Sequence, residues 1–264
     1  MSQMLEPELS AVELRSYFVR KRNALCVRGR FSPLYLDYYL HLMQHGIQYA
    51  ESLDEMLKDV LAALTLHLGS RPQDETCAWT IHVKEPLANL FVTGSTRPGR
   101  VTGRVFTEDV RQDGKALFIA QTTRPEHPTR QSMIEFHDRD LLRAVEQFYT
   151  DSEQRLTRFF RLPDEDFVQI SAEPDCDEAW LAALTLEDVL VLDEHEHLTL
   201  LETRGYVFEC GCSVERLLPV IMRLPQDDLD HIFSDGMALI TCPRCGAVFR
   251  TAKSSFDEWR RKQP

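Results

Sequence analysis

The sequence has no long apolar run. No stretch approaches the roughly 20 apolar residues that are needed to cross a bilayer. The first residues, MSQMLEPELS, also lack a basic region followed by an apolar one. These absences argue against a membrane span and against a secretory signal. We therefore expect a cytoplasmic protein with no membrane partner.

The sequence also lacks cations over one long stretch. Between Arg161 and Arg204 there are thirteen Asp and Glu and no Lys or Arg. Without these thirteen, the 42 acidic residues of the chain fall to 29, against 30 basic ones, so this stretch supplies the whole net charge of -12. Nucleic acid is recognised by a basic face. We therefore expect no nucleic-acid partner.

Motifs of common enzyme families are missing as well. The sequence contains no Gly-x-Ser-x-Gly elbow and no His-Glu-x-x-His helix. The stretch from Gly94 to Gly99 lacks the Lys-Ser/Thr of a phosphate-binding loop and predicts a turn between strands. We interpret the polar run from Asp193 to His197 as an exposed strand end or turn, not as a second metal site. No enzyme is expected, and no catalytic or cofactor-binding residue is predicted.

The cysteines are few and odd in number. Seven Cys fit a secreted disulfide framework poorly and fit a reduced compartment better. Cys26 and Cys77 lie in apolar, strand-like patterns and are predicted to be core residues. Acidic neighbours of Cys176 should raise the pKa of its thiol and lower its reactivity. We expect none of these three thiols to be a nucleophile.

Helical signals are clear in the first 160 residues. Ser32 is predicted to be the N-cap of a helix with proline at its first position, and Gly46 ends it. Ser52 and Glu55 are predicted to form a capping box for a second helix that Gly69 closes. A third helix carries apolar residues on one face and is expected to continue towards Phe160. That face consists of Leu141, Leu142, Val145, Phe148 and Tyr149.

Strand patterns lie between the second and third helices. Apolar and polar residues alternate from Cys77 to Val83, and Asp113-Gly114 is a hairpin turn signal. Further strand-like runs cover residues 87–93, 101–106 and 116–121. Because these runs follow one another without helices, we predict an α+β fold with a mainly antiparallel sheet packed with helices.

Charge and pattern divide the chain into three parts. Residues 1–162 are predicted to form an α+β core domain. Residues 163–205 are predicted to form an acidic linker, which also carries Trp180 and the apolar run Val189-Leu190-Val191-Leu192. Apolar residues at that density predict a segment that docks on the core, while its uncompensated charge limits how tightly it holds. Residues 206–264 are predicted to form a small zinc-binding domain.

The four remaining cysteines form a strong metal-binding pattern. Cys210 and Cys212 make a CxC pair, Cys242 and Cys245 make a CxxC pair, and 29 residues separate the pairs. Zn²⁺ prefers four tetrahedral ligands, and each short spacing lets one turn supply two thiolates. The sequence therefore predicts one four-thiolate zinc site.

The 29-residue spacer and the C-terminus predict a small folded unit. Ser213 is expected to cap a helix that Pro219 bends, and Pro225 is expected to open a second short helix. Residues 237–241 and 247–250 are predicted to form a hairpin around the CxxC turn, and Ser255 to begin a last helix. A unit of this size depends on its metal to stay folded.

The motif allows two roles for the metal. In one, zinc is a structural clip. In the other, oxidants attack the bound thiolates, convert them to disulfides, release the metal and unfold the unit. The spacing permits both.

The combination of CxC, a 29-residue spacer with Leu224-Pro225 and Asp227-Asp228, and CxxC resembles the heat shock protein 33 family of redox-regulated holdase chaperones. The likeness extends to Val27-Arg28-Gly29 and to the stretch from Ser152 to Arg158. The entry to the acidic stretch, Leu162 to Asp166, departs from the family because it replaces a glycine-rich sequence.

The resemblance implies a reduced, zinc-bound and inactive monomer that peroxide with heat, or hypochlorite, converts into an active ATP-independent chaperone. Carried over by position, the redox disulfides would be Cys210-Cys212 and Cys242-Cys245. Loss of zinc would destabilise the linker and expose apolar surface that binds unfolding client proteins, usually with formation of a homodimer. The alternative function is a zinc-ribbon adaptor or regulator in which the metal is purely structural.

Overall fold

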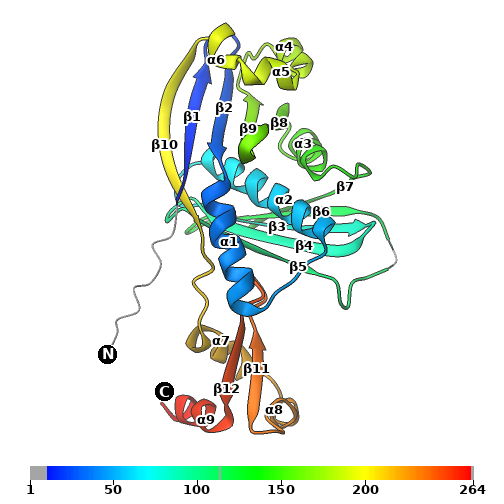
Figure 1. Cartoon of the computed structure of the whole chain (residues 1–264), viewed down its shortest axis with the longest axis vertical. Coiled ribbons are helices and arrows are strands. Elements are labelled where there is room, and N and C mark those ends of the chain that lie inside the picture. The colour runs from blue at the N-terminus through cyan, green and yellow to red at the C-terminus, as the bar shows by residue number, and fades with distance from the viewer. Residues whose placement is uncertain (1–10, 113, 263–264) are drawn as a thin grey trace.

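A computed structural model describes residues 11–112 and 114–262. Strands and helices are mixed along the chain, as the sequence predicts, and the described residues form one large sheet and one two-stranded hairpin (Figure 1). The strands are β1 (Val12–Val19), β2 (Ala24–Arg30), β3 (Thr76–Lys84), β4 (Leu87–Ser95), β5 (Arg100–Phe106), β6 (Leu117–Thr123), β7 (Arg130–Glu135), β8 (Thr157–Arg161), β9 (Asp166–Ala172), β10 (Leu198–Phe208), β11 (Met237–Thr241) and β12 (Val248–Ala252). The helices are α1 (Ser32–His45), α2 (Glu51–Gly69), α3 (Leu141–Asp151), α4 (Glu178–Ala183), α5 (Leu186–Leu190), α6 (Leu192–His195), α7 (Val214–Ile221), α8 (Gln226–Ile232) and α9 (Lys253–Arg261), with a 3-10 turn, η1, at Pro163–Glu165.

The large sheet has two halves that β10 joins. Its strand order is β7-β6-β3-β4-β5-β10-β1-β2-β9-β8, and its pairs are antiparallel except the one between β10 and β5. That parallel pair involves only two positions, Val207 with Arg100 and Phe208 with Val101. In Figure 1 the half with β1, β2 and β10 runs up the page and the half with β3, β4 and β5 runs across it. The α+β prediction with a mainly antiparallel sheet is confirmed.

Helix α2 is the centre of the main core. It packs against β4 and β5 of one half and against β1, β2 and β9 of the other. Leu57, Leu61 and Leu64 on this helix are fully buried, and each buried leucine contributes about 1.5–3 kcal/mol relative to an exposed one. Because α2 contacts both halves, it fixes their relative orientation.

Three local predictions in this region need correction. The helix predicted to continue towards Phe160 ends at Asp151, because the chain adopts a left-handed conformation at Gln154 and then enters β8. No Ser52–Glu55 capping box forms, since α2 already begins at Glu51 with Ala50 as its N-cap. Helix α1 likewise begins at Ser32, so its N-cap is Phe31. The hairpin signal Asp113-Gly114 falls partly outside the described residues.

The acidic stretch is folded against the core. Its first and last parts are β9 and most of β10, which pair within the large sheet. Between them lie α4, α5 and α6, and we call residues 177–196 the acidic cover. Apolar side chains of the cover, Leu181, Leu184, Val189 and Leu192, pack with Val19, Ala24, Cys26, Phe160, Leu162, Val168, Ile170 and Ala172 of the core. The boundaries 1–162, 163–205 and 206–264 stay predictions.

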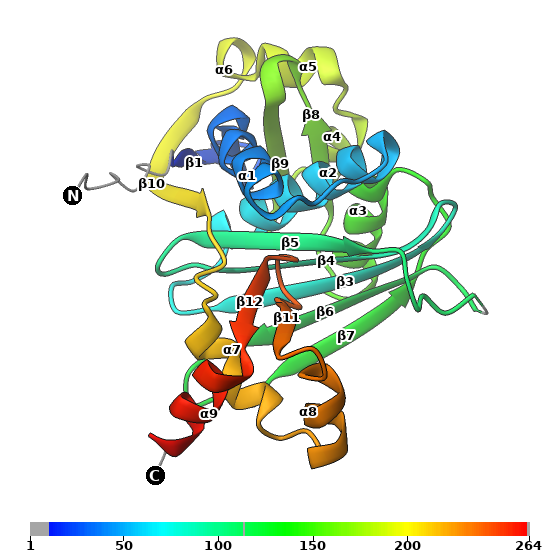
Figure 2. The same ribbon diagram turned by 60° about the horizontal axis from the view of Figure 1, so that its bottom comes forward.

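The C-terminal residues form a separate small unit at the opposite end of the molecule from the acidic cover (Figures 1 and 2). The hairpin of β11 and β12 packs with α7, α8 and α9 around Leu218, Leu229, Phe233 and Phe256. Ser213 caps α7 and Pro225 is the N-cap of α8, as predicted. None of the helices in the described ranges combines the length and apolar character of a membrane span.

Candidate metal centre

Cys210 and Cys212 lie in the loop that follows β10. The backbone N–H of Glu209 donates to the carbonyl of Val101 over 2.9 Å, and the Glu209 carboxylate pairs with Arg100 over 2.8 Å. These contacts fix the loop to the start of β5. Gly211, between the two cysteines, has φ +64°, a conformation that favours glycine. The turn therefore directs both thiols to the same side.

Cys242 and Cys245 lie in the turn between β11 and β12. The N–H of Cys242 donates to the carbonyl of Ala247 over 2.8 Å, and the N–H of Gly246 donates to the carbonyl of Cys242 over 2.9 Å. Gly246 has φ +78°, and a Cβ there would lie 3.1 Å from Cδ1 of Ile47. The positive φ therefore favours a glycine in this turn, and a side chain there would also have to displace the end of Ile47.

The four sulfurs form one cluster. All four Sγ atoms lie within 4.8 Å of one another. The Sγ atoms of Cys210 and Cys242 are 3.7 Å apart, and those of Cys212 and Cys245 are 3.5 Å apart. A tetrahedral Zn²⁺ with Zn–S distances of about 2.3 Å places its sulfurs about 3.8 Å apart. The cluster therefore has the donor set and the spacing to hold a metal ion of that size.

The thiols influence one another strongly. Hydrogen bonding from Cys210 lowers the pKa of Cys242, while hydrogen bonds to the other sulfurs raise the pKa of Cys245. Four neighbouring sulfurs without a cation cannot all be thiolates, because like charges at this separation repel. A bound cation removes that conflict and favours four thiolates.

Two side chains of the core domain contact the backbone of the CxxC turn. His41 of α1 places Nε2 3.0 Å from the carbonyl oxygen of Cys245, and Nη1 of Arg104 on β5 donates to the carbonyl of Cys242 over 3.1 Å. Burial lowers the pKa of His41, so the ring is neutral at pH 7 and donates through an Nε2–H tautomer. The sequence analysis missed both residues, since nothing in the sequence near His41 or Arg104 relates them to the cysteines.

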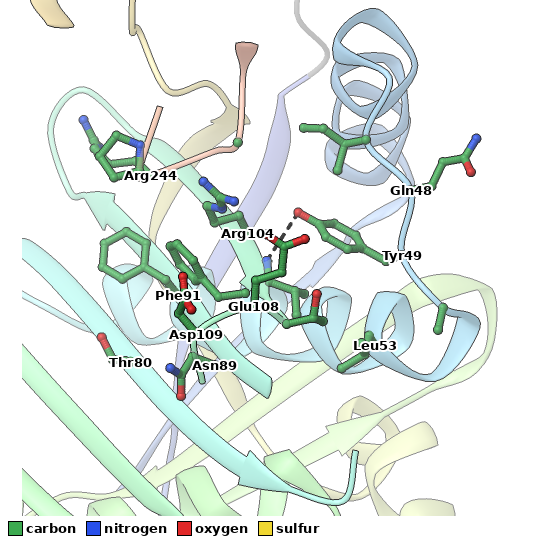
Figure 3. Close-up of a pocket in the computed structure, with 17 residues that line it drawn as sticks. Gln48, Tyr49, Leu53, Thr80, Asn89, Phe91, Arg104, Glu108, Asp109 and Arg244 are labelled. Atoms are coloured by element: carbon green, nitrogen blue, oxygen red, sulfur yellow. Dashed lines mark hydrogen bonds between the residues drawn. The ribbon is translucent and has the colours of Figure 1, made fainter. Parts of the chain in front are cut away.

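A groove of about 1030 Å³ lies beside these contacts, between the core domain and the CxxC turn (Figure 3). Figure 3 shows Arg104 and Tyr49 extending into it, with Arg244 of the turn on the far side. The hydroxyl of Tyr49 accepts a hydrogen bond from the N–H of Val105 over 3.3 Å. The turn thus contacts the core through a few polar residues and leaves an open groove.

The other residues considered in the sequence analysis do not join the cluster. Cys26 and Cys77 are buried, as predicted, and burial raises their pKa values to about 12 and about 11. The pKa of Cys176 is also raised. Burial is the largest cause, and the acidic neighbours Glu178 and Asp177 contribute less. The interpretation of Asp193 to His197 as a strand end or turn is wrong for Asp193 to His195, which belong to α6. Within residues 11–112 and 114–262, the group of His, Cys, Asp or Glu that could hold a metal ion is that of the four clustered cysteines.

Comparison with known proteins gives three kinds of match. The model of the Hsp33 protein family matches residues 162–252. The 33 kDa chaperonin of Ectopseudomonas mendocina is 25% identical over 255 residues, covering 83% of this chain and 86% of the relative. The 33 kDa chaperonin of Azotobacter vinelandii is 27% identical over 256 residues, covering 83% and 85%.

A solved structure shows the same fold. The crystal structure of the 33 kDa chaperonin of Thermotoga maritima, a heat shock protein 33 homologue, aligns with a TM-score of 0.73 and 13% sequence identity. The alignment covers 95% of this chain and 98% of the other. The likeness therefore extends over the core domain, the acidic stretch and the cysteine unit.

Proposed function

Because the chain is a divergent member of the heat shock protein 33 family, we propose that it is an ATP-independent holdase chaperone under redox control. Its clients are unfolding proteins, and its switch is the cluster of Cys210, Cys212, Cys242 and Cys245. Zn²⁺ is the proposed metal of the reduced state. The observation that carries this proposal is the four-sulfur cluster in a unit whose own core is small.

The cysteine unit has few other means of staying folded. Its strands are five residues long, and its apolar core consists mainly of side chains from short helices. A bound Zn²⁺ would hold four thiolates from two distant turns together. When that link is lost, the turns separate, and the contacts of His41 and Arg104 with the CxxC turn are lost with them.

The switch is an oxidation of two thiol pairs. Each pair of thiolates gives up two electrons to one hypochlorous acid, which yields one S–S bond, chloride and hydroxide. The proposed bonds are Cys210-Cys212 and Cys242-Cys245. In the folded cluster Cys210 also lies near Cys242 and Cys212 near Cys245, so crosswise bonds between the pairs are the competing outcome.

Strand β10 is the proposed route from the cluster to the acidic cover. It ends two residues before Cys210 and begins two residues after Glu196. Release of the Cys210 loop frees the end of β10 that pairs with β5 at only two positions. The segment that covers apolar residues of β1, β2 and β9 is attached to the other end of the same strand.

One experiment on reduced, zinc-loaded protein tests the function. Zinc release and suppression of thermal client aggregation are measured on one sample before and after hypochlorite. We expect both to rise together. Bound zinc after oxidation, or no gain in suppression, would contradict the redox switch. Zinc release without any holdase activity in either state would favour the zinc-ribbon adaptor.

Tryptic peptides identify the disulfides. Trypsin cleavage produces residues 205–216 with Cys210 and Cys212, residues 224–244 with Cys242, and residues 245–250 with Cys245. The proposed pairing leaves 205–216 as a single peptide two hydrogens lighter and links 224–244 to 245–250. A link from 205–216 to either of the others would show that oxidation follows the crosswise contacts.

A further inference from the structure

All the cations that pair with the acidic cover come from outside it. From Asp177 to Glu196 the sequence has seven Asp and Glu and no Lys or Arg. The cover therefore repels itself, and its charge favours release from the sheet. Apolar burial holds it in place, together with arginines that the core domain provides.

Arg22, in the turn between β1 and β2, contacts both ends of the cover. Its Nη1 lies 2.6 Å from Oδ2 of Asp177, the N-cap of α4, and its Nε lies 2.9 Å from Oε1 of Glu196, which follows α6. The guanidinium carbon also lies 5.3 Å from the ring centroid of Trp180. The same two residues are also joined through their backbones: the N–H of Asp177 donates to the carbonyl of Arg22 over 3.0 Å.

A second arginine contacts one point inside the cover. Nη1 of Arg158 donates to the carbonyl of Ala182 over 2.8 Å, near the end of α4. The same side chain also lies 3.5 Å from Glu146 of α3. Among the ion pairs of residues 11–112 and 114–262, the two that reach Asp177 and Glu196 both belong to Arg22.

We propose that Arg22 is a latch that holds the acidic cover on the sheet. One guanidinium pairs with the first and last residues of the cover and closes the segment into a loop on the β1–β2 turn. Opening of the cover then depends on this side chain and on ionic strength, because partly exposed ion pairs are screened by salt. The unit of α7, α8, α9, β11 and β12, which carries the CxxC turn, lies at the opposite end of the molecule from the cover (Figure 1), so the latch can open while the metal stays bound.

Protease specificity makes the latch measurable. Trypsin finds no Lys or Arg from residue 162 to residue 203, whereas a glutamate-specific protease has Glu178, Glu187, Glu194 and Glu196 within the cover. Trypsin therefore reports on the rest of the fold and the second enzyme on the cover.

The test compares Arg22→Gln with Arg15→Gln in reduced, zinc-loaded protein. Arg15 lies on β1, where it forms an ion pair with Glu13 and a side-chain hydrogen bond with Tyr17, so its replacement removes the same charge and leaves the ion pairs of Asp177 and Glu196 in place. Loss of two ion pairs and a cation–π contact is expected to speed cleavage in the cover roughly tenfold in Arg22→Gln. The Arg15→Gln rate, the tryptic pattern and the zinc content should stay at wild-type values.

Salt provides a second readout. Raising NaCl from about 50 to about 500 mM shortens the screening length severalfold. Salt screens the self-repulsion of the cover in both proteins but the Arg22 ion pairs only in the wild type, so cleavage of the wild-type cover should accelerate relative to that of Arg22→Gln. Equal cleavage rates for Arg22→Gln and Arg15→Gln, or opening only with loss of zinc, would overturn the latch. If the tryptic pattern shows that Arg22→Gln is misfolded, Asp177→Asn replaces it, because this variant removes one ion pair and keeps all four glutamate cleavage sites. Its expected acceleration is roughly threefold, and no acceleration there overturns the latch equally.

The inference rests on the proposed function only for its activity readout. If Arg22→Gln opens the cover and also suppresses client aggregation without an oxidant, both proposals hold. If the cover opens and no client is protected, the chaperone proposal fails and the latch stands. If the cover stays closed, the latch fails and the chaperone proposal is decided by the oxidation experiment.

Discussion

One buried residue of the core, His67, is polar and forms a hydrogen bond with another buried side chain. His67 on α2 is buried, and its Nδ1 lies 2.6 Å from the hydroxyl of Tyr149. Gln169 donates to the same hydroxyl over 3.0 Å. Burial lowers the pKa of His67 to about 3, from about 6.5 in an unfolded chain. The ring is therefore neutral in the folded protein at every pH above that value.

This predicts a pH dependence of stability. Between pH 6.5 and pH 3 the unfolded state binds a proton at His67 that the folded state does not bind. The free energy of unfolding should therefore fall as pH falls through this window, by about 1.4 kcal/mol at pH 5.5. Urea denaturation at pH 7.5 and pH 5.5 measures the change in wild type and in His67→Gln. Between these two pH values the free energy of unfolding of the variant should fall by about 1.4 kcal/mol less than that of wild type. Equal decreases would show that His67 does not cause the pH dependence.

The cluster predicts which cysteine replacements abolish metal binding. Cys242→Ser removes one of four sulfurs that lie within 4.8 Å of one another, so zinc stoichiometry after dialysis should fall from one per chain towards zero. Cys176→Ser is the matched control, because Cys176 packs beside the acidic cover and outside the cluster. Zinc retained by Cys242→Ser at wild-type affinity would rule out the four-thiolate site.

At the level of elements, β10 is the strand on which the sheet depends. It lies between β5 and β1 and is the link between the two halves of the sheet in the described chain. Its contact with β5 is close: a Cβ at Gly99 would lie 2.0 Å from the carbonyl oxygen of Gly205. No side chain fits at Gly99 unless β10 moves.

Gly99→Ala should therefore weaken this junction. We expect a loss of about 1–3 kcal/mol in the free energy of unfolding and faster amide exchange at Val207, whose N–H donates to the carbonyl of Gly99 over 3.1 Å. Gly205→Ala is the control, because a Cβ there meets only the Cβ of Ala11, at 3.7 Å. Equal free energies of unfolding for the two variants would show that β10 can move away from Gly99 without loss of stability.

The two ends of the molecule are predicted to differ in their dependence on a bound metal. The ten-stranded sheet has a large core of its own, whereas the cysteine unit has a few buried side chains around its cluster. Chelation of the metal should therefore unfold residues 209–262 and leave the sheet folded. Hydrogen exchange before and after chelation measures this, with Cys242→Ser expected to show the chelated pattern without a chelator. Loss of protection in β3 and β4 would contradict the division.

Much of the secondary structure and the grouping of the cysteines could be predicted from the sequence. Alternation of apolar residues from Cys77 to Val83 was enough to predict β3, because side chains of a strand point alternately to the core. The clustering of the four cysteines was predictable for a similar local reason: each pair of cysteines lies within one turn. The predicted end of α3 and the predicted start of α2 were wrong in detail. Gln154 has a positive φ although it is not a glycine, and α2 begins after Ala50, whose side chain cannot act as a cap.

The amino-acid sequence by itself determined the α+β class, the cysteine pairs and the acidic stretch, because spacing and charge are properties of neighbouring residues. Only the tertiary structure decided that Arg22 meets Asp177 and Glu196 and that His41 and Arg104 meet the CxxC turn. These partners are separated by 138 to 204 residues along the chain. Contacts over such distances depend on how the sheet and helices pack as a whole, and no local pattern contains that information.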